Sequence, residues 1–441
     1  MKTLFNCSLW GDEAFSAVLA QREFWTMIQI VAKDTSPPLM YIIMWGWFKI
    51  FGNSELSIRS LSFLFYLGTC VLVYLIAKKL YTKRAGIIAA LLTFFNPFLF
   101  FYAFEGRMYF TLLFFIVLSY YFLLNKKRWG FILSAAAALY SHHFAILAIF
   151  SQFFAQILII FITKQKRTAS ELFKLIKTYL LIGVLYLPWV YPLYMQTKLV
   201  STGFWLGKPK LENLFDLIKN LVKEGGYKKE IEDKILPLYL IILGLRKWSK
   251  KVWQADLHLI IWALLPPTLA FLISQTSISI FYERYLLFCV PPLMILAASR
   301  FRKISLPFIG ILLIVYAFIG YHSFTNPFKK PFKEFTGWIK QNYPDTYLVN
   351  YNGNSHHLWE TKYYGLKAPI YSPGGKLPFF VGTAQMEDED VIYKLGEQQI
   401  GVITSNHPND VNISDYTQNF VYNDGPLYFL LMEKNNDEKN N

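Results

Sequence analysis

Trp10-Gly11-Asp12-Glu13-Ala14-Phe15 places two adjacent carboxylates at the start of an amphipathic stretch. Apolar residues at helical spacing follow over residues 13–31, and a second apolar segment with several aromatic residues covers 38–51. Both segments are too short or too polar to cross a bilayer, which takes about 20 apolar residues as a helix. We therefore expect residues 1–59 to form a loop that lies at a membrane surface as interfacial helices.

The composition indicates a polytopic α-helical membrane protein. The chain has 441 residues, of which 54% are hydrophobic and 17% charged, while soluble domains carry about 25% charged residues. The net charge of +15 does not indicate nucleic acid, because Lys and Arg form short clusters between apolar runs rather than a basic stripe with interleaved aromatics. The three cysteines show no metal-ligand or disulfide spacing.

Charge-free apolar runs predict about ten transmembrane helices within residues 60–325. The expected spans are 60–77, 85–104, 108–125, 129–143, 144–163, 178–197, 231–245, 257–275, 284–299 and 304–322. Every second loop is basic, and the basic residues include Lys78, Lys79, Lys126, Lys127, Lys164, Lys166, Arg167, Arg246, Arg300 and Arg302. This alternation is typical of cytoplasmic loops, so the remaining loops and the C-terminal region are expected outside, in a multi-pass protein of the plasma or inner membrane.

The same alternation places residues 1–59 outside without a span before them. Either the N-terminus is translocated without a leading helix, or a first transmembrane helix is missing before Met1; the sequence favours the second interpretation. After residue 326 the composition changes, and short strand patterns with turn residues predict an extracytoplasmic α/β domain over 326–432. The polar residues 433–441 are expected to be a disordered tail.

Acidic and basic side chains gather at the outer ends of the expected spans. Asp12 could act as a general base, although an acidic pair also stabilises a helix N-terminus. Arg107 has the fork geometry that suits phosphate, and Glu105 could orient it, although a plain polar turn is the simpler interpretation. Asp34 is a second carboxylate candidate or a helix cap, and Arg59 is a weaker phosphate candidate.

Two later clusters lie at the same depth. Glu283, Arg284 and Tyr285 follow an aromatic pair, a pattern that also occurs in interfacial aromatic belts. His142 and His143 form a polar turn and lack the further ligands that a metal site needs. Transporters place ionisable groups within their spans near the midplane, whereas these groups lie at the depth of a lipid headgroup.

These residues occur in motifs that resemble the bacterial family 39-type glycosyltransferases with the GT-C fold, which include relatives of the protein O-mannosyltransferases and the lipid A aminoarabinose transferases. The resemblance covers about residues 8–325. The motifs, in order, are Trp10 to Phe15, Asp34 to Tyr41, Phe51 to Arg59, Phe95-Asn96-Pro97 with Glu105 to Tyr109, Leu139 to His143, and Glu283 to Leu287. Ser36 stands where the family often has His, and the family begins with a span before the Asp-Glu pair.

The resemblance implies transfer of a sugar from a polyprenyl-phosphate donor to a hydroxyl acceptor (lipid, glycan or protein) on the outer face, with inversion at the anomeric carbon. It implies catalytic roles for Asp12 and Glu13. The expected substrate-binding residues are Asp34, Arg59, Glu105, Arg107, Tyr109, His142, His143, Glu283, Arg284 and Tyr285. The sequence requires no cofactor; a divalent cation is allowed but unsupported. The alternatives are a lipid-linked sugar flippase or transporter and a non-catalytic cell-envelope scaffold.

Overall fold

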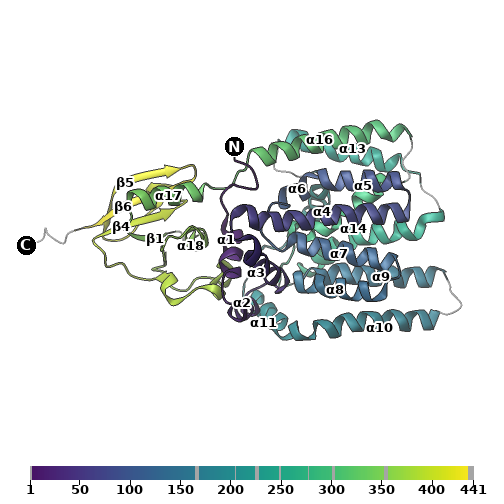
Figure 1. Ribbon diagram of the computed structural model, residues 1–441, viewed down its shortest axis with the longest axis horizontal. Coiled ribbons are helices and arrows are strands. Elements are labelled where there is room, and N and C mark those ends of the chain that lie inside the picture. Colours follow the sequence, from purple (N-terminus) through teal and green to yellow (C-terminus); the bar gives the residue numbers. More distant parts are fainter. Residues whose placement is uncertain are drawn as a thin grey trace, which may run out of the picture.

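The computed structural model describes residues 2–163, 168–203, 205–223, 228–247, 250–276, 278–299, 303–351 and 356–435. A bundle of long helices carries a small sheet domain at one end, and three short helices lie between them (Figure 1). The fold is that of a polytopic helical membrane protein with a C-terminal sheet domain, as the composition predicts. Some of the basic loop residues named above, Lys164, Lys166, Arg167, Arg300 and Arg302, lie outside the described residues.

The helices between the two parts are α1 (Gly11–Ala20), α2 (Phe24–Lys33) and α3 (Leu39–Phe51). The amphipathic stretch expected over 13–31 is therefore two helices. The break occurs because the Glu23 side chain accepts a hydrogen bond from the Thr26 amide at 2.9 Å and caps α2. At the end of α3, Gly52 adopts a φ of 72°, a backbone conformation that glycine tolerates best.

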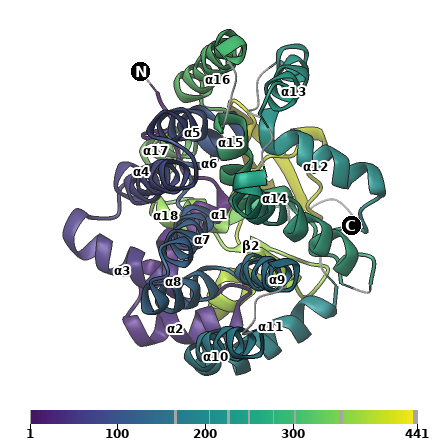
Figure 2. The ribbon, with the colours of Figure 1, turned by 90° about the vertical axis from the view of Figure 1, so that its right-hand side faces the viewer.

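Helices occupy each region where a span is expected. They are α4 (Glu55–Leu80), α5 (Lys83–Phe95), α6 (Pro97–Tyr102), α7 (Tyr109–Leu124), α8 (Arg128–Ser141), α9 (Ala145–Thr163), α10 (Thr168–Tyr186), α11 (Val190–Ser201), α12 (Leu211–Lys223), α13 (Lys229–Gly244), α14 (Trp253–Ile273), α15 (Val290–Ala298) and α16 (Leu306–Thr325). In the view along the bundle, α10, α13 and α16 lie at its outside (Figure 2).

Within the described residues, five helices are long and apolar enough to cross a membrane by length and composition: Glu55–Leu80, Ala145–Thr163, Ala169–Ser201, Trp253–Ile273 and Lys303–Thr325. The other expected spans are shorter or interrupted. The region 85–104, for example, is broken where the Asn96 side chain accepts from the Leu99 amide at 2.9 Å and Pro97 opens α6. Helix α12 was not expected, because the loop that contains it is amphipathic rather than apolar.

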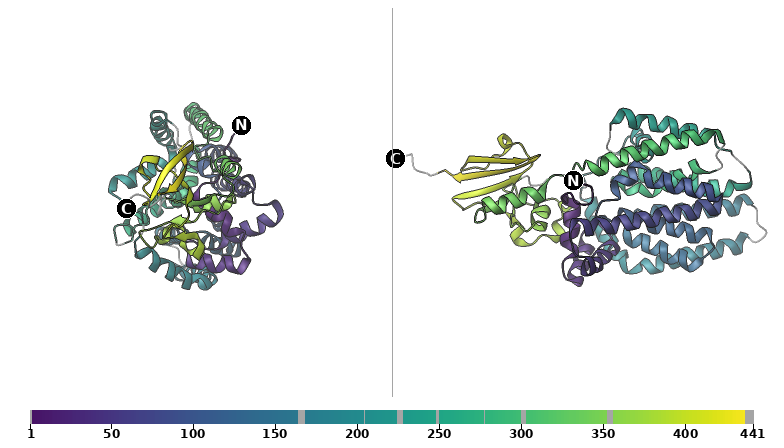
Figure 3. Two further views of the ribbon diagram at one scale, coloured as in Figure 1. Left: turned by 90° about the vertical axis from the view of Figure 1, so that its left-hand side faces the viewer. Right: turned by 45° about the horizontal axis from the view of Figure 1, so that its top comes forward.

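The described basic loops meet at the end of the bundle that is opposite the sheet domain. The Lys79 ammonium donates to the side-chain amide oxygen of Asn125 at 2.7 Å, which joins the last turn of α4 to the end of α7. Arg246 lies 2.5 Å from Asp256 and 3.5 Å from the Tyr81 hydroxyl. The sheet domain stands off the other end, next to α1 (Figure 3).

The C-terminal domain contains α17 (Phe332–Asn342), α18 (Leu358–Tyr363) and a sheet of β1 (Tyr347–Asn350), β2 (Ile370–Tyr371), β3 (Val391–Ile392), β4 (Gln399–Thr404), β5 (Tyr416–Asp424) and β6 (Leu427–Lys434). The strand order is β3-β2-β1-β4-β6-β5; β6 is antiparallel to both of its neighbours, whereas β1 to β4 pair in parallel. Because β6 runs to Lys434, the polar tail expected from 433 starts no earlier than Asn435; residues 436–441 lie outside the described part.

Candidate active site

The two adjacent carboxylates of α1 point to different places. Glu13 has no solvent exposure, whereas the Asp12 side chain is 36% exposed. Successive residues of an α-helix are turned by about 100° from each other, so a helix with one buried face separates an acidic pair in this way. The Asp12 carboxylate is therefore accessible from solvent, whereas the Glu13 carboxylate is not.

Glu13 is the centre of a buried ion network. It accepts from Arg59 Nε at 3.1 Å and Nη2 at 2.8 Å, from Lys329 Nζ at 2.8 Å and from the Gly106 amide at 3.0 Å. Burial alone would raise the pKa of Glu13, but Arg59 and Lys329 outweigh it and lower the pKa to about 2. With both oxygens occupied and no exposure, Glu13 has no room to contact a substrate; its geometry is that of a positioning residue.

Arg59 is also fully buried, at the start of α4. Its remaining N–H groups donate to the carbonyl oxygens of Cys7 at 2.6 Å and Ser8 at 3.0 Å. The expectation that Arg59 binds phosphate does not fit this geometry, because its guanidinium is saturated by the protein. Arg59 instead ties the N-terminal segment to the bundle.

Asp12 faces Arg284, which comes from the segment before α15. The Arg284 Nη2 lies 3.2 Å from the Asp12 Oδ2. Aromatic rings surround the guanidinium, with its central carbon 4.7 Å from the Tyr282 ring centre and 5.5 Å from that of Tyr109, a distance range in which cations are attracted to ring faces. Tyr109 thus lies beside Arg284 and is itself buried.

Arg107 lies on the other side of Asp12. Its Nη1 donates to the Ser16 hydroxyl at 2.7 Å and to the Asp12 carbonyl oxygen at 3.2 Å. Its Nε is buried and has no hydrogen-bond partner. The loop that carries it is tightly packed, since a Cβ on Gly106 would lie 2.2 Å from the Ile58 side chain. Arg107 is therefore held in place, while its Nε has no hydrogen-bond partner within the protein.

A cleft of about 350 Å³ lies over these residues, and we name it the Asp12 cleft. Its membrane-side wall includes Asp12, Asp34, Thr35 and Arg107, and its other wall comes from Trp205 and the C-terminal domain through His356, Trp359 and residues 380–382. Burial raises the pKa of Asp34 above its ordinary value and lowers the pKa of His356 to about 4. A carboxylate pair and a guanidinium thus face a wall of aromatic side chains.

A second cleft, the apolar cleft, has a volume of about 300 Å³ and shares Thr35 and Arg107 with the Asp12 cleft. Helices α9, α11 and α14 contribute aliphatic residues to it, and His142, His143 and Tyr285 line its inner end. Burial lowers the pKa of His143 to about 4 and that of His142 well below its ordinary value. Both imidazoles are therefore neutral, and His143 lies 2.9 Å from the Gln196 amide oxygen.

Two further residues that were expected to bind substrate, Glu105 and Glu283, lie in different places. Glu105 is buried beside Lys329, whose Nζ lies 3.9 Å from it, and burial raises the pKa of Glu105 to about 7. Glu283 accepts a hydrogen bond at 2.9 Å from Asn220 of α12 and lines neither cleft. The expectation that Glu283 binds substrate is therefore not supported by its position in the described structure.

The structure adds residues that the sequence motifs did not reveal: Trp205, Lys329, Lys330, His356, Trp359 and Glu360. Lys329 and Lys330 could have been selected from the sequence. Two consecutive lysines follow the last expected span, on the side of the membrane where loops are expected to be poor in basic residues. The residues from the C-terminal domain carried none, since isolated aromatic and acidic residues in a mixed α/β sequence have no distinguishing spacing.

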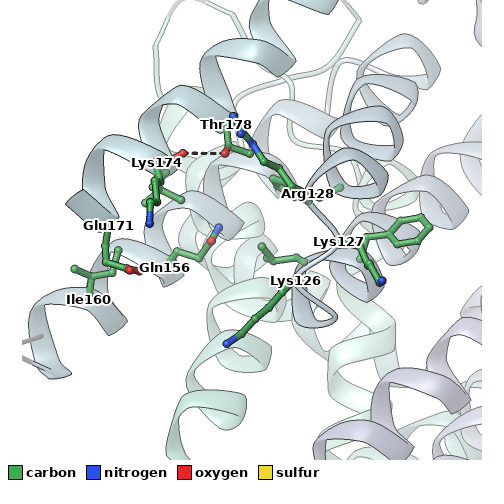
Figure 4. Close-up of a pocket in the computed structure, with 12 residues that line it drawn as sticks. Lys126, Lys127, Arg128, Gln156, Ile160, Glu171, Lys174 and Thr178 are labelled. Atoms are coloured by element: carbon green, nitrogen blue, oxygen red, sulfur yellow. Dashed lines mark hydrogen bonds between the residues drawn. The ribbon is translucent and has the colours of Figure 1, made fainter. Parts of the chain in front are cut away.

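A further cleft, of about 270 Å³, lies at the basic end of the bundle (Figure 4). Lys126, Lys127 and Arg128 approach it from the loop before α8, and Lys174 and Glu171 from α10. The four basic residues are exposed, as is typical of a solvated basic loop, and the cleft includes none of the residues around Asp12. We do not regard it as the active site. Within the described residues, no group of three or more His, Cys, Asp or Glu could hold a metal ion.

Comparison with known proteins places this geometry in a known fold. The structure resembles ArnT from Cupriavidus metallidurans in the apo state, with a TM-score of 0.66, 14% identity, and coverage of 97% of this chain and 94% of that chain. It also resembles ArnT bound to undecaprenyl phosphate, with a TM-score of 0.62, 12% identity, and the same two coverages. The chain has the GT-C fold. The oligosaccharyltransferase of Archaeoglobus fulgidus, in a complex with Zn and sulfate, matches with a TM-score of 0.54, 14% identity, and coverage of 91% of this chain and 65% of that chain.

The sequence comparison agrees with this GT-C fold. Residues 35–194 match the family model described as dolichyl-phosphate-mannose-protein mannosyltransferase. Together with the fold, this match indicates that the chain is a membrane glycosyltransferase. The matched segment contains Arg107, His142 and His143 but not Asp12 or Arg284. No curated protein sequence matches the chain.

Proposed function

We propose that this GT-C glycosyltransferase transfers a sugar from a polyprenyl-phosphate donor to a hydroxyl acceptor on the outer face of the plasma or inner membrane. The observation that carries the proposal is the meeting of two clefts at Thr35 and Arg107. One cleft is apolar and suits a hydrocarbon chain, while the other contains the Asp12 carboxylate. The likeness to ArnT bound to undecaprenyl phosphate supports a lipid of this class.

The polyprenyl chain occupies the apolar cleft, where neutral His142 and His143 impose no charge on it. Its phosphate lies against Arg107, whose guanidinium has an Nε without a hydrogen-bond partner in the protein and suits an anionic oxygen. The sugar then extends into the Asp12 cleft, towards Trp205 and Trp359. Aromatic rings with a few polar groups are typical of ligand sites.

In the reaction, the Asp12 carboxylate takes the proton of the acceptor hydroxyl, and the hydroxyl oxygen forms a bond to C1 of the sugar. The bond between C1 and the phosphate oxygen breaks, and its electron pair leaves on the polyprenyl phosphate. Attack from the side opposite the leaving group inverts the configuration at C1. Arg107 stabilises the charge that develops on the phosphate. Arg284, at 3.2 Å, holds the Asp12 carboxylate in place.

The test uses the purified protein in detergent with polyprenyl-phosphate sugars, and measures release of the polyprenyl phosphate and formation of product. A detergent micelle does not separate two compartments, so transport cannot take place in it. Product formation there therefore distinguishes a transferase from a flippase. Asp12→Asn should abolish most turnover, while Asp345→Asn, an exposed carboxylate in the turn before β1, should not change it. Full turnover by Asp12→Asn at an unchanged protein level would show that Asp12 is not the base.

A further inference from the structure

A third cleft lies behind the pair formed by Asp12 and Arg284, and we name it the Trp10 cleft. Its volume is about 370 Å³. Most of its walls come from the bundle and from the segment that follows α16, and one residue comes from α18. The lining residues are Trp10, Gly11, Phe101, Tyr102, Glu105, Arg284, Phe328, Lys329, Lys330, Phe332 and Glu360. Gly11 lines both this cleft and the Asp12 cleft. The Trp10 cleft therefore adjoins the Asp12 cleft at Gly11 and includes Arg284, the ion-pair partner of Asp12.

Four polar atoms in the residues that line this cleft are buried without a hydrogen-bond partner. They are Trp10 Nε1 and Arg284 Nε, which donate, Glu360 Oε2, which accepts, and Glu105 Oε2, which belongs to a carboxyl group that can donate when protonated. Glu105 and Glu360 are each only 4% exposed. Buried polar atoms in proteins are normally satisfied, so four unsatisfied atoms around one cavity indicate a site that is completed by a ligand.

The chemistry of these atoms selects the ligand class. The cleft is also lined by Arg284, Lys329 and Lys330, but Arg284 is paired with Asp12 and Lys329 with Glu13. An anion alone would leave the Glu360 carboxylate without a donor, while a hydrocarbon chain would leave all four atoms unsatisfied. A sugar hydroxyl both donates and accepts, so a ring with several hydroxyls matches the mixture. The apolar part of the wall fits the same ligand, because Phe101 and Phe328 stack with centres 5.2 Å apart and planes at 10°.

We propose that the Trp10 cleft binds a carbohydrate acceptor, whose ring is held by Glu360 and Trp10 and whose free hydroxyl reaches Asp12 past Gly11. This proposal rests on the transferase function proposed above. It gives the C-terminal domain a part in the choice of acceptor, since Glu360 belongs to that domain. His357 lies nearby, with its Nδ1 3.7 Å from the Glu360 Oε1.

The first test is direct binding of free mono- and disaccharides to the purified full-length protein in detergent, measured by tryptophan fluorescence and thermal shift. Glu360→Gln should weaken binding by about tenfold or more, because it weakens a hydrogen bond to a charged group. Glu389→Gln, an exposed carboxylate of the same domain, should leave binding unchanged. Saccharide affinity that is unaffected by Glu360→Gln would overturn the proposal.

The second test separates this proposal from the transferase function. Transfer from the polyprenyl-phosphate sugar is measured with saccharides and with Ser/Thr peptides as acceptors, and hydrolysis of the donor is measured with neither. Glu360→Gln should raise the acceptor KM, whereas Glu389→Gln should change neither the acceptor KM nor donor hydrolysis. Transfer to peptides but not to saccharides would overturn the carbohydrate proposal alone. Saccharide binding that depends on Glu360 without any use of the donor would instead overturn the transferase function.

Discussion

Asp12 and Arg284 form an ion pair at 3.2 Å in which the carboxylate is 36% exposed and the guanidinium 13%. The next carboxylate along the chain, Glu13, is fully buried between Arg59 and Lys329. Asp12 can therefore meet a substrate while Glu13 holds three segments of the chain together. The adjacent acidic pair thus combines a solvent-accessible carboxylate, which we propose as the general base, with a buried structural one.

Exchange of each carboxylate for its amide should give opposite results. Asp12→Asn should leave the melting temperature nearly unchanged and lower kcat by about 10² to 10⁴, the usual contribution of a general base. Glu13→Gln should destabilise the protein by about 3–5 kcal/mol, because it leaves buried cations without their partner. Thermal unfolding in detergent and turnover of the surviving folded protein check the pair. Equal losses of stability in the two variants would contradict this division of roles.

Arg107→Lys should keep a positive charge but lose the planar fork that fits a phosphate. We expect the protein to fold normally and kcat to fall by about 10² to 10³, the range seen when a donor that stabilises transition-state charge is removed. The measurement is steady-state turnover at varied concentrations of the polyprenyl-phosphate sugar. Arg84→Lys at the start of α5, exposed in the basic loop, is the matched control. Unchanged kinetics in Arg107→Lys would place the phosphate elsewhere.

Much of this fold could be predicted from apolar run length, because a bilayer sets the length of a helix and the alternation of basic loops sets its direction. Helix α12 escaped prediction because only one of its faces, with Leu217 and Leu221 buried, is apolar, so the segment has no continuous apolar run. Strand β5 escaped for a similar reason, since six of its nine residues are exposed and it lacks a clear alternation of apolar and polar residues.

The candidate site could be predicted only in part from the sequence. Residue type and depth identified Asp12, Arg107 and Arg284, which lie together in the structure. The same criteria also selected Arg59 and Glu283. Residue type and depth do not show which face of a helix is buried, or which charged side chain is already paired within the protein. Glu360 is invisible by any local criterion, since only the docking of the C-terminal domain onto α1 brings it near Asp12.

Glu105 should make stability depend on pH. Burial raises its pKa from 4.5 to about 7, so the folded protein keeps a proton that the unfolded chain loses. Stability due to this group is therefore fully present below about pH 4.5 and falls as pH rises towards 7. Glu105→Gln cannot ionise, so its melting temperature relative to the wild type should increase between pH 5 and 8. Glu389→Gln should show no such trend, and a constant difference for Glu105→Gln would contradict the raised pKa.

Gly382 should be essential for the contact between the C-terminal domain and α1. Its φ is +88°, and a Cβ there would lie 2.8 Å from Trp359 Nε1 and 2.9 Å from the Phe15 ring. Phe15 and Trp359 themselves pack edge to face at 5.2 Å, so neither ring has room to move away without opening the Asp12 cleft.

Gly382→Ala should therefore destabilise the protein by about 2 kcal/mol or more, from backbone strain and overpacking together. Because Trp359 lines the Asp12 cleft, the KM for the sugar donor should rise as well. Gly374→Ala is the control, since it has no atom within 4 Å of its added Cβ. Thermal unfolding and donor kinetics are measured for both. If Gly382→Ala behaved like Gly374→Ala, the domain would not be held to α1 by this contact, and its part in forming the cleft would have to be abandoned.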